Sequence, residues 1–251
     1  FSRKKYMKSM INFENQKKFT YPFDYLVVDD CFDTSILNKL LEEWPTDKLA
    51  EQGGVMGGRR QLSNTGAEQA ALGWMGQSAP TWKSFYDYMN TDEMFIKFRN
   101  EFKPSLNKWG CTLTEKDMIL SLKMFLHVDW SEAGDGYVRE IHADSQKRFL
   151  NFLIFFNDKN WEGGDFVIHS SDNIKRFSPP ASGYKELYNE ENAPIHKVIE
   201  AKKNRAVFFL SSPNSLHSVS KQTNSKEYRK FIYGAYSRRD KTIPVFRNYD
   251  N

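Results

Sequence analysis

"GYVREIHADSQKRFLNFLIFFN", residues 136–157, is the stretch that decides the fold. A β-rich segment, a short polar turn at 145–148 and a Phe-rich apolar run follow one another without a gap. The apolar run is short for a helix and rich in side chains that favour strands, so it predicts a buried strand. Together the two segments predict antiparallel strands joined by a tight turn.

The same pattern of short strand-like segments continues on either side, from about residue 117 onward. Short β-rich runs are separated by turn residues, and no gap between them holds a helix long enough for a crossover connection. The runs are 118–128, 136–144, 148–157, 164–170, 195–201, 205–212, 215–222 and 229–237. This pattern predicts an antiparallel sandwich or barrel, interrupted by a polar surface insertion at about 171–194.

The first half of the chain has a different pattern. After a predicted strand at 24–30, apolar residues recur at helical spacing, which predicts helices over 34–44, 80–89 and 92–102. Asp33 and Thr91 are the expected N-cap residues of the first and third helices, because short polar side chains accept hydrogen bonds from free backbone N–H groups. The glycine-rich segment 52–66 predicts a mobile loop.

These patterns predict a mainly β protein with flanking N-terminal helices. The expected organisation is a strand and helix region at 1–116 packed on the core, a β core at 117–240 that carries the insertion, and a C-terminal tail at 241–251.

Composition restricts the class of protein. With 251 residues, 39% of them hydrophobic and 15% aromatic, the chain can bury a large core, which disfavours disorder. The net charge of +4 comes without a basic stripe, so nucleic acid is not the expected partner. No apolar run approaches the roughly 18 residues of a membrane span, and no secretory apolar segment stands near the start. A cytoplasmic protein without a membrane partner is therefore expected.

The pattern His-x-Asp occurs twice, at 127–129 and at 142–144. Residues i and i+2 of a strand lie on one face, so either pair can present two ligands to one metal ion. A second histidine brought in by folding completes the two-histidine, one-carboxylate set that holds Fe(II) and leaves other positions open. The second triplet is favoured because further strands, a glycine turn and His217 follow it, whereas the first runs into the predicted loop 130–136.

An ordered set of motifs carries a family resemblance: "GYVREIHAD" (136–144), "FLNFLIFFN" (149–157), "WEGGDF" (161–166), "LHSV" (216–219) and Arg229. The set resembles the Fe(II)/2-oxoglutarate-dependent dioxygenases, in particular the prolyl 4-hydroxylase-like branch. The resemblance covers about 117–238, roughly half of the chain. It implies a double-stranded β-helix, a relative of the jelly roll, which agrees with the strand pattern.

The resemblance also implies roles for single residues. His142, Asp144 and His217 would hold Fe(II), with 2-oxoglutarate and O2 as co-substrates. Arg229 would pair with the distal carboxylate of 2-oxoglutarate, for which a planar guanidinium is suited. The implied reaction hydroxylates an unactivated C–H bond and releases succinate and CO2. Related halogenases lack the carboxylate that Asp144 supplies here, so its presence favours hydroxylation.

Two positions depart from the family pattern. Phe231 stands where many relatives have Ser or Thr two residues after the arginine, and Phe155 stands near the place of a tyrosine that binds the co-substrate. Another polar group is then needed beside Arg229. The candidates for this role are Asn151, which strand alternation from Phe155 directs inward, Tyr137 and Tyr233.

Substrate recognition is expected in the loops and N-terminal helices, because loops on a rigid scaffold usually carry recognition. The resemblance favours an amino acid or a peptidyl residue such as proline, within the wider class of small-molecule or peptide substrates. Candidate substrate-binding residues are Arg59, Arg60 and Trp161; binding by the two arginines would imply an anionic substrate, and solvated positions are their alternative. The remaining histidines, His127, His169 and His196, are expected to be ordinary hydrogen-bonded residues.

A non-catalytic, cupin-like jelly-roll module that binds a metal or a small ligand is the alternative function. Such a module has the same strands and histidines, but it has no need of Arg229. Binding of 2-oxoglutarate through Arg229 therefore separates the two hypotheses.

Overall fold

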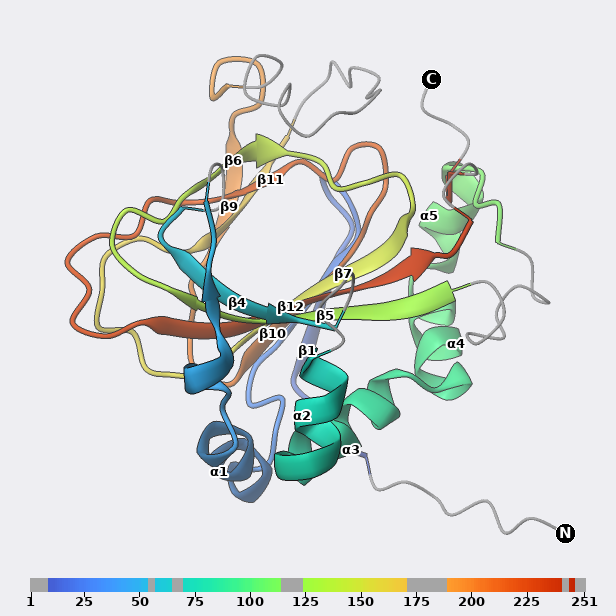
Figure 1. The fold of residues 1–251 in the computed structure, drawn as a ribbon. Helices are drawn as coiled ribbons and strands as arrows, with labels where there is room; N and C mark the ends of the chain where they lie inside the picture. The colour runs from blue at the N-terminus through green and yellow to red at the C-terminus, as the bar shows by residue number, and fades with distance from the viewer. Residues whose placement is uncertain are drawn as a thin grey trace, which may run out of the picture.

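A computed structural model of the chain describes residues 9–53, 57–64, 70–113, 124–170, 189–240 and 244–246. Two antiparallel sheets face each other, as Figure 1 shows. The larger sheet has eight strands in the order β1-β2-β10-β7-β12-β5-β4-β3, and the smaller has four in the order β6-β11-β8-β9. The predicted fold class, a mainly β jelly roll with flanking N-terminal helices, is confirmed.

Each of the eight β-rich runs predicted after residue 117 contains a strand. These strands are β5 (Met124–Ala133), β6 (Arg139–His142), β7 (Arg148–Phe155), β8 (Phe166–His169), β9 (Ile195–Ile199), β10 (Arg205–Leu210), β11 (His217–Val219) and β12 (Arg229–Arg238). The N-terminal region adds β1 (Gln16–Phe19), β2 (Tyr25–Val28), β3 (Ala50–Glu51) and β4 (Arg59–Ser63) to the larger sheet. Residues 118–123 and 171–188, within the predicted first run and the predicted insertion, lie outside the described residues.

Alternation along the strands gives the larger sheet two apolar faces. On β7, Leu150, Phe152 and Ile154 belong to the cluster that packs against the helices. Leu153 and Phe155 belong to a second cluster, which lies between the two sheets. Because successive side chains of a strand point to opposite faces, one continuous apolar run can serve both layers.

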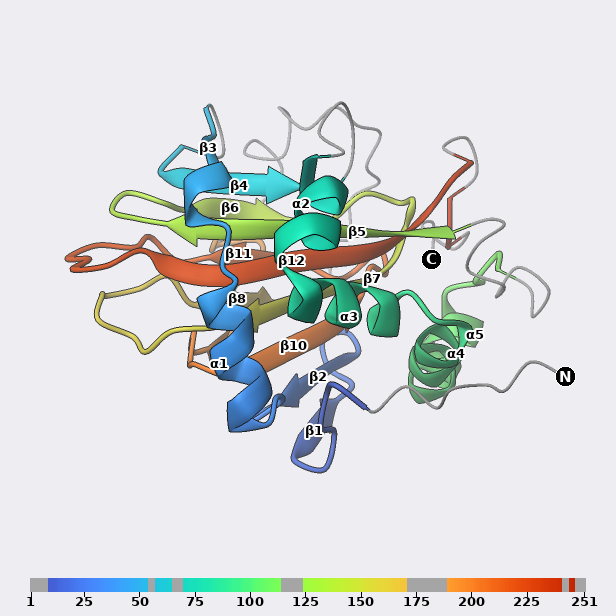
Figure 2. The same ribbon diagram turned by 60° about the horizontal axis from the view of Figure 1, so that its bottom comes forward.

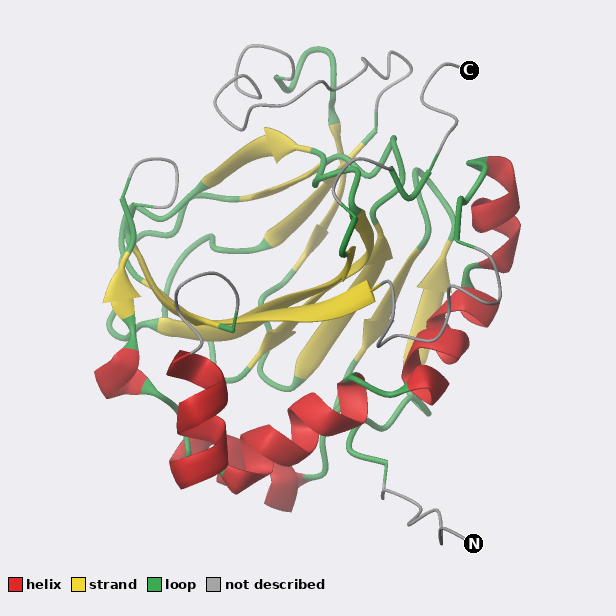
Figure 3. Ribbon diagram, turned by 45° about the vertical axis from the view of Figure 1, so that its right-hand side comes forward, coloured by secondary structure: helices red, strands yellow, loops and turns green. Residues whose placement is uncertain are grey.

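The helices gather on one side of the molecule, against the outer face of the larger sheet (Figure 2, Figure 3). They are α1 (Thr34–Glu42), α2 (Ala70–Ser78), α3 (Pro80–Met89), α4 (Asp92–Glu101) and α5 (Lys103–Lys108). The three predicted helices are confirmed as α1, α3 and α4. Thr91 caps α4 through its Oγ1, which accepts from the N–H of Met94 at 3.3 Å. Asp33 is the N-cap residue of α1 as predicted, but its side chain makes no capping hydrogen bond.

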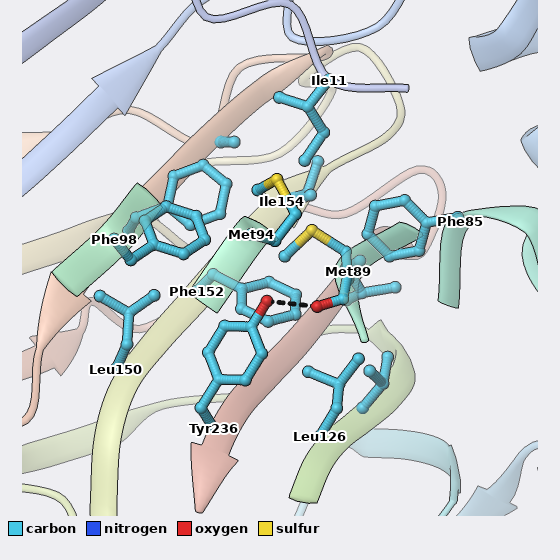
Figure 4. Packing of buried hydrophobic residues seen from close by; sticks show 14 of the residues in the cluster. Ile11, Phe85, Met89, Met94, Phe98, Leu126, Leu150, Phe152, Ile154 and Tyr236 are labelled. Carbon is cyan, nitrogen blue, oxygen red and sulfur yellow. Dashed lines mark hydrogen bonds between the residues drawn. The ribbon is translucent and has the colours of Figure 1, made fainter. Parts of the chain in front are cut away.

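Figure 4 shows buried side chains of α3 and α4, such as Phe85 and Phe98, in one cluster with side chains of the larger sheet. Phe98 of α4 packs with Phe152 of β7 in the same buried cluster. The buried hydroxyl of Tyr236 donates to the carbonyl oxygen of Met89 at 2.6 Å, which joins β12 to the end of α3. A buried phenol that finds such a partner keeps its apolar contribution without an unsatisfied polar atom.

The structure corrects two loop predictions. The segment 52–66 is not a loop throughout: β4 lies within it and pairs with β5, and residues 54–56 and 65–66 lie outside the described part. The segment 130–136 also begins as strand, since β5 continues to Ala133 and buries Trp130 completely. Both segments have a polar sequence that favours a loop. They form strands because they pair with neighbouring strands, and the local sequence does not show this pairing.

Candidate functional site

The inner faces of the two sheets enclose a cavity of about 140 Å³. A ligand the size of a small dicarboxylate fits such a volume. The apolar part of the wall comes from both sheets and consists mainly of Leu153, Phe155, Phe166, Phe209 and Phe231. The polar part includes the second His-x-Asp triplet and several arginines.

Strand pairing brings His142, Asp144 and His217 together. His142 on β6 lies directly opposite His217 on β11 in the register of the smaller sheet. Asp144 follows two residues later, with its carboxylate oxygens 3.9 Å from His142 Nε2 and 3.4 Å from His217 Nε2. One ligand atom from each residue lies within 4.8 Å of the other two, the geometry needed to surround one metal ion.

Backbone carbonyls orient both imidazoles. His142 Nδ1 lies 2.7 Å from the carbonyl oxygen of Glu140, and His217 Nδ1 lies 2.8 Å from that of Ser215. With its N–H at Nδ1, each ring presents the lone pair of Nε2 on the side of Asp144, the usual arrangement of metal-binding histidines. Burial, together with the neighbouring His217, lowers the pKa of His142 to about 3, so its imidazole is neutral at physiological pH.

The carboxylate of Asp144 is held from a second side. Arg148 Nη1 donates to Asp144 Oδ1 at 2.6 Å, and the hydroxyl of Tyr233 lies 3.2 Å from Asp144 Oδ2 and 2.9 Å from Asn151 Oδ1. Burial opposes ionisation of Asp144, but Arg148 and the two histidines outweigh it and hold its pKa well below the usual range. Arg148 was missed in the sequence, where it reads as the end of a polar turn; its place at the start of β7 was the available signal.

Arg229 is a buried cation without a carboxylate partner in the described part of the chain. It is 2% exposed, and its Nε has no hydrogen-bond partner there. Aromatic rings surround the guanidinium, with centroids at 4.8 Å for Phe231, 5.4 Å for Tyr137 and 6.0 Å for Phe155. Burial lowers its pKa to about 10. A buried charge without a partner is costly, so this site suits an anionic ligand.

Gly164 has no side chain, and the guanidinium of Arg229 occupies the space beside it. Its φ is +69°, and a Cβ placed on it would lie 3.1 Å from Arg229 Nη1 and 3.2 Å from Trp161 Nε1. A glycine is therefore required here both by the left-handed backbone and by the close approach of the guanidinium. The motif "WEGGDF" thus supports the anion site.

The predicted substrate-binding residues lie in different surroundings. Arg59 is buried in the cavity wall, where its guanidinium donates to Ser131 Oγ and lies 3.5 Å from Asp129 Oδ2. Arg60 points away from the cavity and pairs with Glu132. Trp161 is buried among apolar residues near Gly164 and does not line the cavity. Of the three, only Arg59 can contact a ligand in this cavity.

The other histidines have partners of their own. His127 Nε2 lies 2.8 Å from Asp129 Oδ1, so the first triplet closes on itself. His169 uses both ring nitrogens, Nδ1 at 2.8 Å from the carbonyl oxygen of Ala193 and Nε2 at 2.8 Å from Ser218 Oγ. His196 is exposed on β9, outside the cavity.

Comparison with known proteins agrees with this geometry. Residues 114–237 match the family described as the 2OG-Fe(II) oxygenase superfamily. No curated protein matches the chain in sequence. No helix among the described residues has the length and apolar character needed to cross a membrane.

Solved structures share the fold at low identity. HygX from Streptomyces hygroscopicus, solved with nickel, 2-oxoglutarate and hygromycin B bound, is 8% identical with a TM-score of 0.53 over 89% of this chain and 85% of that chain. The epimerase SnoN, solved with Fe3+, alpha ketoglutarate and nogalamycin RO, is 12% identical with a TM-score of 0.54 over 85% and 78%. A Pseudomonas putida prolyl-4-hydroxylase is 13% identical with a TM-score of 0.49 over 86% and 92%. At these identities the likeness to HygX and SnoN shows the fold alone.

Proposed function

The chain belongs to the 2OG-Fe(II) oxygenase superfamily, and on that premise we propose that His142, Asp144 and His217 hold its Fe(II) while Arg229 binds 2-oxoglutarate. Three ligand atoms that converge on one point support the metal assignment. The buried guanidinium in the same cavity supports the co-substrate assignment.

Bound Fe(II), with 2-oxoglutarate and O2, supplies an oxidative decarboxylation that yields succinate and CO2 and oxidises a C–H bond of the substrate. The chain's own residues prepare the site for this. The carbonyls of Glu140 and Ser215 fix the histidine tautomers, and Arg148 and Tyr233 orient Asp144. The Phe-rich wall excludes water, which strengthens the interactions between charges inside the cavity.

Tyr137 is the best-placed helper for Arg229. Its ring lies 5.4 Å from the guanidinium, and it lines the cavity where Phe231 and Phe155 offer no hydroxyl. Tyr233 and Asn151 instead contact each other beside Asp144, on the metal side of the cavity. We therefore assign the missing hydrogen bond to the co-substrate to Tyr137 and not to Tyr233 or Asn151.

The observation that carries the proposal is the unpaired Arg229 beside a converging metal set. A cupin-like binding module needs the metal set but no buried cation next to it. The carboxylate of Asp144 fills a metal position, which supports hydroxylation as the reaction. The substrate we propose is a small molecule or a peptide residue, with an amino acid or peptidyl proline as first candidates.

The test measures three quantities on one preparation: Fe(II) affinity under anaerobic conditions, 2-oxoglutarate affinity of the metal-loaded protein, and succinate released after O2 is admitted. Wild type should bind both and release succinate. Asp144→Ala should lose metal binding and succinate release. Arg229→Ala should keep metal binding and lose 2-oxoglutarate affinity. If the wild type binds metal but not 2-oxoglutarate, the cupin-like module is correct instead.

A further inference from the structure

The cavity contains more positive charge than the proposed function uses. The charged residues that line it are four arginines and two aspartates: Arg59, Arg139, Arg148, Arg229, Asp129 and Asp144. Two of these arginines already face a carboxylate, since Arg148 contacts Asp144 and Arg59 lies near Asp129. Two arginines remain without an aspartate.

Of these two, Arg229 is already assigned to the distal carboxylate of 2-oxoglutarate. The other carboxylate of that co-substrate belongs to the metal, so 2-oxoglutarate leaves Arg139 unmatched. Arg139 is half-buried, and it forms neither a hydrogen bond nor an ion pair with any other residue in the described part of the chain. The net charge of the fully loaded cavity therefore stays positive.

A register irregularity turns Arg139 into the cavity. Strict alternation would place Arg139 on the face of Ile141, away from His142, and Ile141 does pack into a separate apolar cluster. The pairing of β6 with β11 is shifted, however, so that His217 faces His142 while Val219 faces Arg139. A two-residue step on β11, from His217 to Val219, thus matches a three-residue step on β6, from His142 to Arg139, and a bulge of this kind re-aims a side chain. Both Val219 and Arg139 line the cavity.

We propose that Arg139 binds a carboxylate of the primary substrate, so that this oxygenase acts on a small carboxylic acid. This inference rests on the proposed function, because the charge that remains is counted after Fe(II) and 2-oxoglutarate are bound. A planar guanidinium matches a planar carboxylate through two parallel hydrogen bonds. Arg139 lies on the same strand as His142, three residues before it, so an acid anchored there places its neighbouring C–H bonds toward the proposed metal site.

The experiment uses full-length protein loaded anaerobically with Fe(II) and saturating 2-oxoglutarate. The probes are a set of N-acetyl amino acids, each paired with its C-terminal amide, so that the members of a pair differ only in the carboxylate. Binding of each probe is measured by calorimetry. The variants are Arg139→Gln and Arg139→Lys, and Arg239→Gln is the matched control because Arg239 is exposed beyond the end of β12.

The wild type should bind at least one acid about tenfold or more tightly than its amide, the preference expected of a charge-assisted hydrogen bond. Arg139→Gln should reduce that ratio to about one, Arg139→Lys should retain part of it, and Arg239→Gln should leave it unchanged. Equal affinity for acids and amides in the wild type, no acid binding at all, or a preference that survives in Arg139→Gln would overturn the proposal. If the Fe(II)-loaded wild type does not bind 2-oxoglutarate at all, the proposed function itself is wrong.

Discussion

The two His-x-Asp triplets share a spacing and differ in almost everything else. In the first, on β5, His127 Nε2 lies 2.8 Å from Asp129 Oδ1, and Arg59 lies 3.5 Å from the other carboxylate oxygen. In the second, at the end of β6, His142 Nε2 is 3.9 Å from Asp144 Oδ1, and a backbone carbonyl holds the other ring nitrogen. In the first triplet the histidine and the aspartate contact each other, whereas in the second their ligand atoms converge with one from His217.

The difference comes from the neighbouring strands. β5 is flanked by β4 and β12, and Arg59 of β4 supplies a cation that satisfies Asp129. β6 is flanked by β11, which supplies His217 in direct register with His142. A spacing of two residues puts two side chains on one face. The partner strand then supplies Arg59 to the first triplet and His217, the third residue of the proposed metal site, to the second.

The largest expected effect is a difference in Fe(II) affinity between variants of the two triplets. His142→Ala should lower Fe(II) affinity by more than about 100-fold, since even the outer partners of metal ligands contribute 10- to 100-fold. His127→Ala should leave Fe(II) affinity nearly unchanged, because its Nε2 is directed at Asp129. Anaerobic Fe(II) titration of both variants measures this, with circular dichroism as a folding control. Equal losses in the two variants would contradict the comparison.

The next largest effect concerns Arg229, the cation proposed to bind 2-oxoglutarate beside the second triplet. Arg229→Gln should weaken 2-oxoglutarate binding by about 10- to 100-fold, the range of a lost hydrogen-bonded charge of about 1.5–3 kcal/mol. Fe(II) affinity should change little, because Arg229 does not contact the metal residues. Calorimetric titration of metal-loaded protein gives the affinity, and Arg239→Gln is the matched control. An unchanged affinity for 2-oxoglutarate would remove Arg229 from the site.

The first triplet should show its role in stability. Asp129→Asn should lower the free energy of unfolding by about 2 kcal/mol near neutral pH, because the buried Arg59 loses its counter-charge. Burial opposes ionisation of Asp129, but His127 and Arg59 outweigh it and lower its pKa.

The pH dependence of that difference has a definite sign. An aspartate whose pKa is depressed by folding stabilises the fold above its unfolded pKa of about 3.9 and loses this contribution as the pH falls further. The gap in unfolding free energy between wild type and Asp129→Asn should therefore be full at neutral pH and shrink below about pH 4. Urea denaturation at several pH values measures it, and a gap that widens on acidification would contradict the role given to Asp129.

The sequence predicts the strands of the smaller sheet and the apolar strands of the larger sheet, and it misses β1, β3 and β4 at the two ends of the larger sheet. β7 and β10 are buried on both faces, and such strands appear as unbroken apolar runs. β4, in contrast, has the polar sequence "RRQLS", and its pairing with β5 and β3 makes it a strand. α2 was missed for a related reason: its two glycines and weak amphipathicity leave its packing on α3 as the main support.

The same limit applies to the site. The second triplet and Arg229 follow from local motifs, because each residue stands at a recognisable place on its own strand. The inward turn of Arg139 depends on a shift between β6 and β11, and the place of Arg59 depends on which strand adds to the edge of β5. Register between distant segments is a tertiary property, so strand periodicity alone points Arg139 the wrong way.

The smallest expected effects are those of Tyr233→Phe and Tyr137→Phe. The sequence alone gives both tyrosines as candidates for the same role. The Tyr233 hydroxyl lies 3.2 Å from Asp144 Oδ2, so Tyr233→Phe should weaken Fe(II) binding about fivefold, as for one hydrogen bond worth about 1 kcal/mol. Tyr137→Phe should spare Fe(II) and weaken 2-oxoglutarate binding by a similar factor, because the ring of Tyr137 lies by Arg229. Removing one hydroxyl from each ring keeps the packing matched, so the two variants control for each other. If Tyr233→Phe changed 2-oxoglutarate affinity and left Fe(II) affinity intact, Tyr233 would belong to the co-substrate site. The orientation of Asp144 would then depend on its hydrogen bond from Arg148.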